Sequence, residues 1–148
     1  MIKKILMCPP KYFQIEYEIN PWMDMNNRVD QPKAMQEYQV LRDTYRGLGY
    51  VVEEIDPGEG LPDMVFVNNN GWVQEGKFIR ANMKYDQRKG ETALVEGFFE
   101  KQGLEVVGLP KECIFEGQGD LLRSENKYFF GWGKRSTYET KQEIADIL

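Results

Sequence analysis

The chain has 148 residues, of which 41% are hydrophobic, 29% charged and 13% aromatic, a composition typical of a globular protein with one domain. Its net charge of −5 argues against nucleic acid as the main partner, since phosphate binding needs a basic surface. No apolar run reaches the length of about 18 residues that a membrane span requires, so no membrane association is predicted and a cytoplasmic location is expected.

The sequence contains no histidine and only two cysteines, Cys8 and Cys113. The absence of histidine removes the commonest general base and the commonest metal ligand, so Ser-His-Asp and Cys-His mechanisms are excluded within these residues. The cysteines form no Cys-x-x-Cys pair, so neither a zinc site nor a disulfide framework is predicted. We expect no metal site.

The first half of the chain alternates between strands and a helix. Its apolar start predicts a first strand. Residues 33–48 carry apolar side chains at helical spacing and predict an amphipathic helix that Gly49 ends. Short apolar runs then predict strands over 50–55 and 64–67, and the Asn- and Gly-rich segment 68–71 ends the second of these.

The second half repeats this order. Residues 89–102 predict a second helix that Gly103 ends, followed by a strand over 104–107 and another that begins at 114–115. A Ser-Thr-Tyr-Glu sequence at 136–139 fits a capping box and predicts a third helix. The pattern predicts an α/β fold of about three strand-strand-strand-helix units with a period of about 50 residues.

Two acids, Glu116 and Asp120, flank a turn that contains Gly117 and Gly119 and follows an apolar segment. Glycine permits positive φ and close approach of another backbone or a ligand. An acid held at such a turn can be shielded from water and aimed, as general acid-base chemistry or cation binding requires. The alternative is a surface hairpin with a polar tip.

Further polar side chains lie at predicted strand ends and helix starts: Asp63, Asn68, Asn69, Arg88 and Arg135. If the units are related by rotation, these ends converge. Carboxylates and carboxamides would then face a cation, and the planar arginine side chains would face a carboxylate. An amino acid with a guanidinium or ammonium side chain has both features.

Each of these residues also has a structural interpretation. Arg88 and Glu91 are three residues apart on a helix and could form a solvated ion pair, and Arg135 could neutralise Glu139. The asparagines could serve backbone geometry alone. Phe66 is expected in the core, with a second role in a site left open. The tryptophans at 22, 72 and 132 are expected to be core or lid residues.

Three motifs together resemble the guanidino-group-modifying superfamily, which includes amidinotransferases, arginine deiminase and dimethylarginine dimethylaminohydrolase. They lie at residues 62–67, 115–120 and 131–136. The resemblance implies that residues 1–148 form a single domain, the N-terminal part of a five-bladed α/β propeller (pentein). It implies an arginine-like small molecule as ligand and no cofactor. The implied chemistry is attack of a cysteine thiolate on the guanidinium carbon, and hydrolysis and amidino transfer both stay open.

By this resemblance, Glu116 is the catalytic acid that holds the guanidinium group. Arg88 and Arg135 match arginines that grip the carboxylate end of the substrate. Asn69 lies where the dimethylarginine hydrolases carry an aspartate, and its neutral side chain weakens one charge-assisted hydrogen bond. The full set of implied substrate-binding residues is Asp63, Phe66, Asn69, Arg88, Asp120 and Arg135.

The catalytic histidine and nucleophilic cysteine of the family lie beyond Leu148, and Cys8 and Cys113 match neither. We therefore expect the N-terminal portion of a longer enzyme, inactive by itself. Open propeller edges predict a homo-oligomer or a complementing C-terminal half. Two alternatives are a non-catalytic module that binds arginine-like ligands and an interaction protein that uses its open edges.

Overall fold

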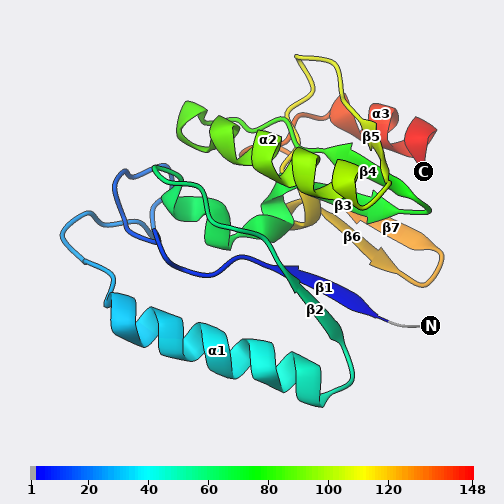
Figure 1. Cartoon of the computed structure of the whole chain (residues 1–148). Coiled ribbons are helices and arrows are strands. Elements are labelled where there is room, and N and C mark those ends of the chain that lie inside the picture. The colour runs from blue at the N-terminus through cyan, green and yellow to red at the C-terminus, as the bar shows by residue number, and fades with distance from the viewer. Residues whose placement is uncertain (1–2) are drawn as a thin grey trace. The chain divides into compact units, whose positions relative to one another are not determined.

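The protein has the mixed α/β fold that the sequence predicts (Figure 1). The structure, a computed structural model, describes residues 3–148. Its helices are α1 (Gln31–Gly47), α2 (Asp86–Lys101) and α3 (Thr140–Ile147). Its strands are β1 (Lys4–Met7), β2 (Val51–Glu54), β3 (Gly71–Gln74), β4 (Lys77–Arg80), β5 (Glu105–Val107), β6 (Leu121–Ser124) and β7 (Lys127–Phe130). These elements form two compact units, one that ends at Val67 and one that covers Asn68–Leu148.

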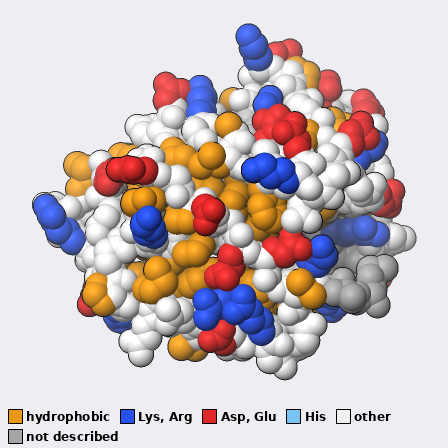
Figure 2. Space-filling view, viewed as in Figure 1, with side chains coloured by type: hydrophobic (Ala, Val, Ile, Leu, Met, Phe, Trp, Pro, Cys, Tyr) orange, Lys and Arg blue, Asp and Glu red, His pale blue; other side chains and the backbone are white. Residues whose placement is uncertain are grey.

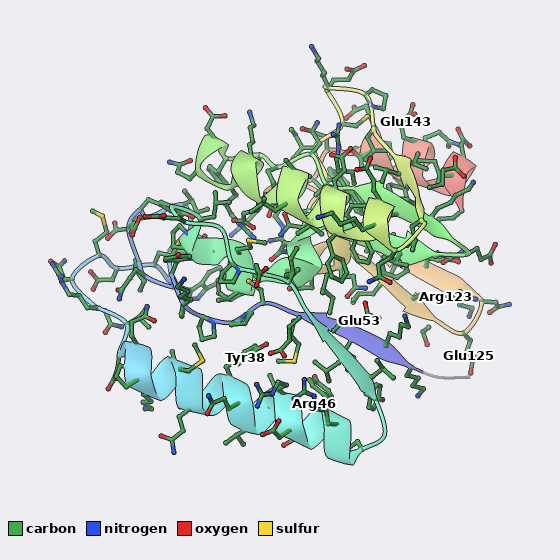
Figure 3. The ribbon with its side chains drawn as sticks, viewed as in Figure 1. Tyr38, Arg46, Glu53, Arg123, Glu125 and Glu143 are labelled. Atoms are coloured by element: carbon green, nitrogen blue, oxygen red, sulfur yellow. The ribbon has the colours of Figure 1, made fainter. Side chains whose placement is uncertain are left out.

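In the first unit, α1 connects the parallel strands β1 and β2, as a helix usually does between neighbouring parallel strands. The predicted first strand is confirmed as β1, although Ile2 lies outside the described residues. From α1, Tyr38 donates a hydrogen bond to Glu54 at 2.5 Å and Arg46 donates one at 3.2 Å. Figure 3 shows both side chains projecting from α1 toward the β1–β2 ribbon, so polar contacts as well as packing hold the helix there.

The helix predicted over 33–48 is confirmed within two residues at its start and one at its end. Asp30 caps its N-terminus, because its side chain accepts a hydrogen bond from the Lys33 amide at 3.1 Å. The predicted apolar stripe is only partly covered: Leu41 and Leu48 are exposed. None of the residues of α1 is buried.

The predicted helix stops are confirmed. Gly49 and Gly103 follow α1 and α2 with φ of 84° and 79°, a region that glycine enters without strain. The amide of Gly49 donates to the Arg46 carbonyl at 3.0 Å, and that of Gly103 donates to the Glu100 carbonyl at 2.9 Å. The same turn therefore delivers the chain from each helix into β2 and β5.

The second unit contains two antiparallel hairpins, β3–β4 and β6–β7. β5 adds to the first hairpin in parallel with β4, and α2 makes the connection between these two strands. Side chains from both hairpins, from α3 and from the segment before Glu116 share one core: Trp72, Ile79, Phe115, Leu121 and Ile144.

The strand predicted over 64–67 is wrong. The segment forms two short 3₁₀ helices, Pro62–Val65 and Val67–Asn70. Pro62 lacks an amide donor for a sheet, and the Phe66 amide donates to the Asp63 carbonyl at 2.9 Å, so local turns replace strand pairing. Phe66 is 44% exposed, which contradicts its predicted place in the core.

Two further local predictions need correction. Phe115 makes only an isolated antiparallel bridge with Asn82, rather than beginning a strand. The capping box at 136–139 does not form, since α3 begins at Thr140 and the Ser136 hydroxyl donates to Asp120 instead. The partly buried Asp120 carboxylate competes successfully for this hydroxyl.

The tryptophans divide between interior and surface. Trp72 is buried, whereas Trp22 and Trp132 are exposed and do not belong to the core. Figure 2 shows basic and acidic side chains interspersed with apolar ones on the face in view, without one continuous basic patch. Within residues 3–148, none of the helices has the length and apolar character needed to cross a bilayer.

Candidate functional site

The candidate site is built on the glycine turn after Phe115. Residues Gly117–Gly119 form one 3₁₀ turn, and Gly117 has φ of 56°. A Cβ atom on Gly117 would lie 2.5 Å from the Asn68 carbonyl oxygen and 2.6 Å from the Gly71 amide nitrogen. The turn thus packs backbone against backbone on the segment before β3, which confirms the predicted reason for glycine.

Gly119 makes room for side chains from two other segments. A Cβ atom there would lie 2.2 Å from Arg135 Nη2 and 2.3 Å from Asn69 Nδ2. Asn69 Nδ2 also donates to the Glu116 carbonyl oxygen at 3.4 Å. Asn69 and Arg135, 66 positions apart in the chain, therefore meet over this turn.

Glu116 lies at the centre of the site and is 3% exposed. Its Oε2 atom lies 3.3 Å from Arg135 Nη1 and 3.9 Å from Arg88 Nη1. Arg88 Nη1 also donates to Asn69 Oδ1 at 3.5 Å. One buried carboxylate is thus approached by two guanidinium groups, one from α2 and one from the loop before α3.

Arg88 is anchored on its far side by Glu91. Arg88 Nε donates to Glu91 Oε1 at 2.8 Å, and Nη2 donates to Oε2 at 2.8 Å. Asn70 Nδ2 adds a third bond, to Oε2 at 3.0 Å. Arg88 is 5% exposed and Glu91 is fully buried, so the ion pair expected at this spacing forms but is not a solvated one.

Arg135 is anchored in the same way by Asp120. Arg135 Nε donates to Asp120 Oδ1 at 2.7 Å, and Ser136 Oγ donates to Oδ2 at 2.5 Å. The Glu116 amide also donates to Oδ2, at 3.3 Å. Arg135 therefore pairs with Asp120 and Glu116, in place of the Glu139 partner that its spacing had suggested.

The cluster alternates in charge. Carboxylates of Glu91, Glu116 and Asp120 carry three negative charges, and the two arginines Arg88 and Arg135 carry two positive ones. The buried charges among them, on Arg88, Glu91 and Glu116, are tolerated because they are paired and hydrogen-bonded. The sum over these five side chains is −1.

The structure gathers five of the predicted site residues: Asn69, Arg88, Glu116, Asp120 and Arg135. Asp63 and Phe66 belong to the first unit, where Asp63 is buried and Phe66 packs edge-to-face on Phe13 at 5.8 Å. Their roles stay predictions.

Sequence reasoning missed three members of the cluster: Asn70, Glu91 and Ser136. The spacing of three residues predicts Glu91 as an ion-pair partner of Arg88, but it does not predict that Glu91 is buried. Ser136 follows Arg135 directly and had been assigned to a helix cap.

Cys8 and Cys113 are both buried and reduced. Burial raises the pKa of the Cys113 thiol, and a hydrogen bond with Thr140 opposes this only in part. A raised pKa disfavours the reactive thiolate. Among the described residues, no group of three or more His, Cys, Asp or Glu side chains is arranged to hold a metal ion.

No protein-family model matches the chain, but individual known proteins do. The chain is 34% identical to an N(G),N(G)-dimethylarginine dimethylaminohydrolase of Mycobacterium tuberculosis over 99% of its own length and 48% of that protein's. It is similar to the product-bound N-terminal domain of ArgZ, an arginine dihydrolase of cyanobacteria, with a TM-score of 0.92 and 32% identity over 99% of this chain and 55% of that one. An AgrE mutant in complex with L-arginine matches with a TM-score of 0.91 and 32% identity, over 97% of this chain and 22% of that one. The chain thus spans about half the length of the dimethylaminohydrolase relative.

Proposed function

Because the chain is homologous to guanidino-group-modifying enzymes of the pentein superfamily, we propose that its buried cluster is one part of a site for an arginine-like molecule. The observation that carries this proposal is the convergence of Glu116, Asn69 and two arginines on one glycine turn. Solved neighbours bind L-arginine or a reaction product, which supports the same ligand class.

The charge of the cluster favours a ligand with one net positive charge. Glu116 would accept hydrogen bonds from a guanidinium group, and a buried carboxylate is a stronger acceptor than a neutral group. Asn69 Oδ1 would add a neutral acceptor beside it. Arg135, whose side chain is 35% exposed, would reach the carboxylate end of the ligand.

The 148 residues supply binding groups rather than the nucleophile. They contain no histidine, and both cysteines are buried. We propose that the whole activity, either hydrolysis such as dihydrolase or dimethylaminohydrolase chemistry or else amidino transfer, needs a thiolate and a histidine from a complementing part. In this proposal the chain by itself binds arginine-like ligands without turnover.

Repeated local structure supports the proposal that residues 1–148 are part of a propeller of rotated units. The Ala81 amide donates to the Asn70 carbonyl at 3.0 Å, and the Gly131 amide donates to the Asp120 carbonyl at 2.8 Å, so both hairpins close in the same way 50 residues apart. In the described part of the chain, β6 and β7 pair only with each other. We propose that a second copy or a complementing C-terminal half adds to this ribbon.

Calorimetry on the purified chain tests the ligand class. We expect saturable binding of L-arginine and agmatine and weaker binding of L-ornithine, which lacks the guanidinium group. Glu116→Gln should weaken L-arginine binding by about tenfold or more, since a hydrogen bond to a charged group is worth about 1.5–3 kcal/mol. The matched control is Glu96→Gln, which removes another carboxylate paired with an arginine in the same unit. Absence of saturable binding, or equal effects of the two variants, would contradict the proposal.

A further inference from the structure

We propose that Glu91 is a positioning residue that fixes the orientation of Arg88 in the ligand site. The ligand-related part of this inference rests on the proposed function, whereas the geometric part does not. Glu91 engages Nε and Nη2, which form one edge of the planar guanidinium group. With that edge fixed at two points, the group cannot rotate about its long axis, and Nη1 is directed toward Asn69 and Glu116.

Glu91 is itself held in place. It is fully buried, and Asn70 Nδ2 donates to its Oε2 atom at 3.0 Å. Asn70 is also fully buried, and its carbonyl oxygen accepts a bond from the Ala81 amide, so the β3–β4 hairpin fixes it. The orientation of Arg88 is therefore set by a chain of contacts that runs back to the sheet.

Stability alone gives little reason for this pair. A buried ion pair is often no more stabilising than apolar side chains of the same size, because both charges lose their hydration. The ion pair between Arg80 on β4 and Glu96 on α2 shows the ordinary arrangement: one contact of 2.9 Å between partly exposed side chains. The two-point, buried contact of Glu91 instead provides direction, which a flexible surface pair lacks.

The direction matters for specificity. In the proposed complex, the oriented Nη1 edge of Arg88 would exchange its 3.9 Å contact with Glu116 for the carboxylate of an α-amino acid whose side chain ends in a guanidinium or ammonium group. Agmatine has the guanidinium group of arginine but no carboxylate. Glu91 therefore contributes to discrimination between these two ligands, although it touches neither.

The test combines side-chain NMR with binding. In the wild-type chain, the Arg88 Nε–H proton, assigned with an Arg88→Lys variant, should exchange with water far more slowly than that of Arg123, which donates to the Glu125 carbonyl at an exposed turn. In Glu91→Gln the exchange should accelerate, and the preference for L-arginine over agmatine should fall by about tenfold, or about 1.4 kcal/mol. Glu96→Gln on the same helix should change neither quantity.

The outcomes separate the two proposals. Fast exchange of Arg88 Nε–H in the wild-type chain overturns the positioning role and needs no variant, so a Glu91→Gln chain that fails to fold leaves the test valid. Equal weakening of both ligands by Glu91→Gln also overturns it. Slow exchange that Glu91→Gln accelerates, in a chain that binds neither ligand, supports the positioning role and overturns the proposed function.

Discussion

Replacing Gly117 with alanine tests whether the site depends on backbone-to-backbone packing at the glycine turn. The matched control is Gly76→Ala in the β3–β4 hairpin. Both glycines have positive φ, 56° and 80°, but a Cβ atom on Gly76 would meet nothing within 4 Å. The two variants therefore share the strain of a positive φ, and only Gly117→Ala adds a steric clash with neighbouring backbone atoms.

The expected losses in the free energy of unfolding follow from the backbone strain and from the steric clash. Positive φ costs alanine about 1–2 kcal/mol, of which about 0.4–1 kcal/mol is offset because alanine restricts the unfolded chain. At Gly117 the Cβ atom would also lie 2.5 Å from the Asn68 carbonyl oxygen, so that backbone has to move. Overpacking of this kind adds about 1–3 kcal/mol.

Urea unfolding, followed by circular dichroism and by tryptophan fluorescence to which buried Trp72 contributes, measures the stability of both variants. We expect Gly117→Ala to lower the free energy of unfolding by about 1–3 kcal/mol more than Gly76→Ala does. Equal losses in the two variants would refute the reasoning, because they would show that the close approach at Gly117 does not constrain the fold.

Two further substitutions probe the polar contacts. Ser136→Ala removes the 2.5 Å hydrogen bond to Asp120 and should lower the free energy of unfolding by about 1–3 kcal/mol. The control Ser124→Ala, at an exposed position of β6, should have almost no effect. Similar losses of stability in urea unfolding of the two variants would contradict the assigned role of Ser136. Glu54 has a lowered pKa, chiefly because Tyr38 donates a hydrogen bond to it and then because of nearby arginines. Because its pKa is lower in the folded state, the Glu54 carboxylate stabilises the fold at pH values above its pKa in the unfolded chain. This stabilisation is lost as the pH falls through its lower pKa in the folded state. The free energy of unfolding should therefore vary less with pH between about pH 6 and pH 3 in Glu54→Gln than in the wild type. Identical slopes of this free energy against pH would exclude the contribution of Glu54.

Features that depend on neighbouring residues were predictable from the sequence. Gly49 and Gly103 end their helices because glycine adopts positive φ wherever the helix before it stops, and no distant residue is needed. The positive φ of Gly117 was predictable for the same reason, since it is a property of this residue's own backbone.

Features that depend on distant partners were not predictable from the sequence. The segment 64–67 has an apolar strand pattern, but a strand needs a pairing partner from elsewhere in the chain, and this segment forms local turns that begin at Pro62 instead. Ser136 has the sequence of a helix cap, yet its hydroxyl bonds to Asp120, a carboxylate 16 positions earlier in the chain. Burial of Glu91 likewise requires the β3–β4 hairpin beside it, which spacing along a helix does not reveal.

A crystal structure of this chain grown with saturating L-arginine tests the central claim most directly. The account predicts guanidinium nitrogens within about 3 Å of the Glu116 carboxylate. It also predicts that Arg88 keeps its two bonds to Glu91 when the ligand is bound. Arginine bound away from the Glu116 turn, or an unliganded turn at saturating arginine, would contradict it.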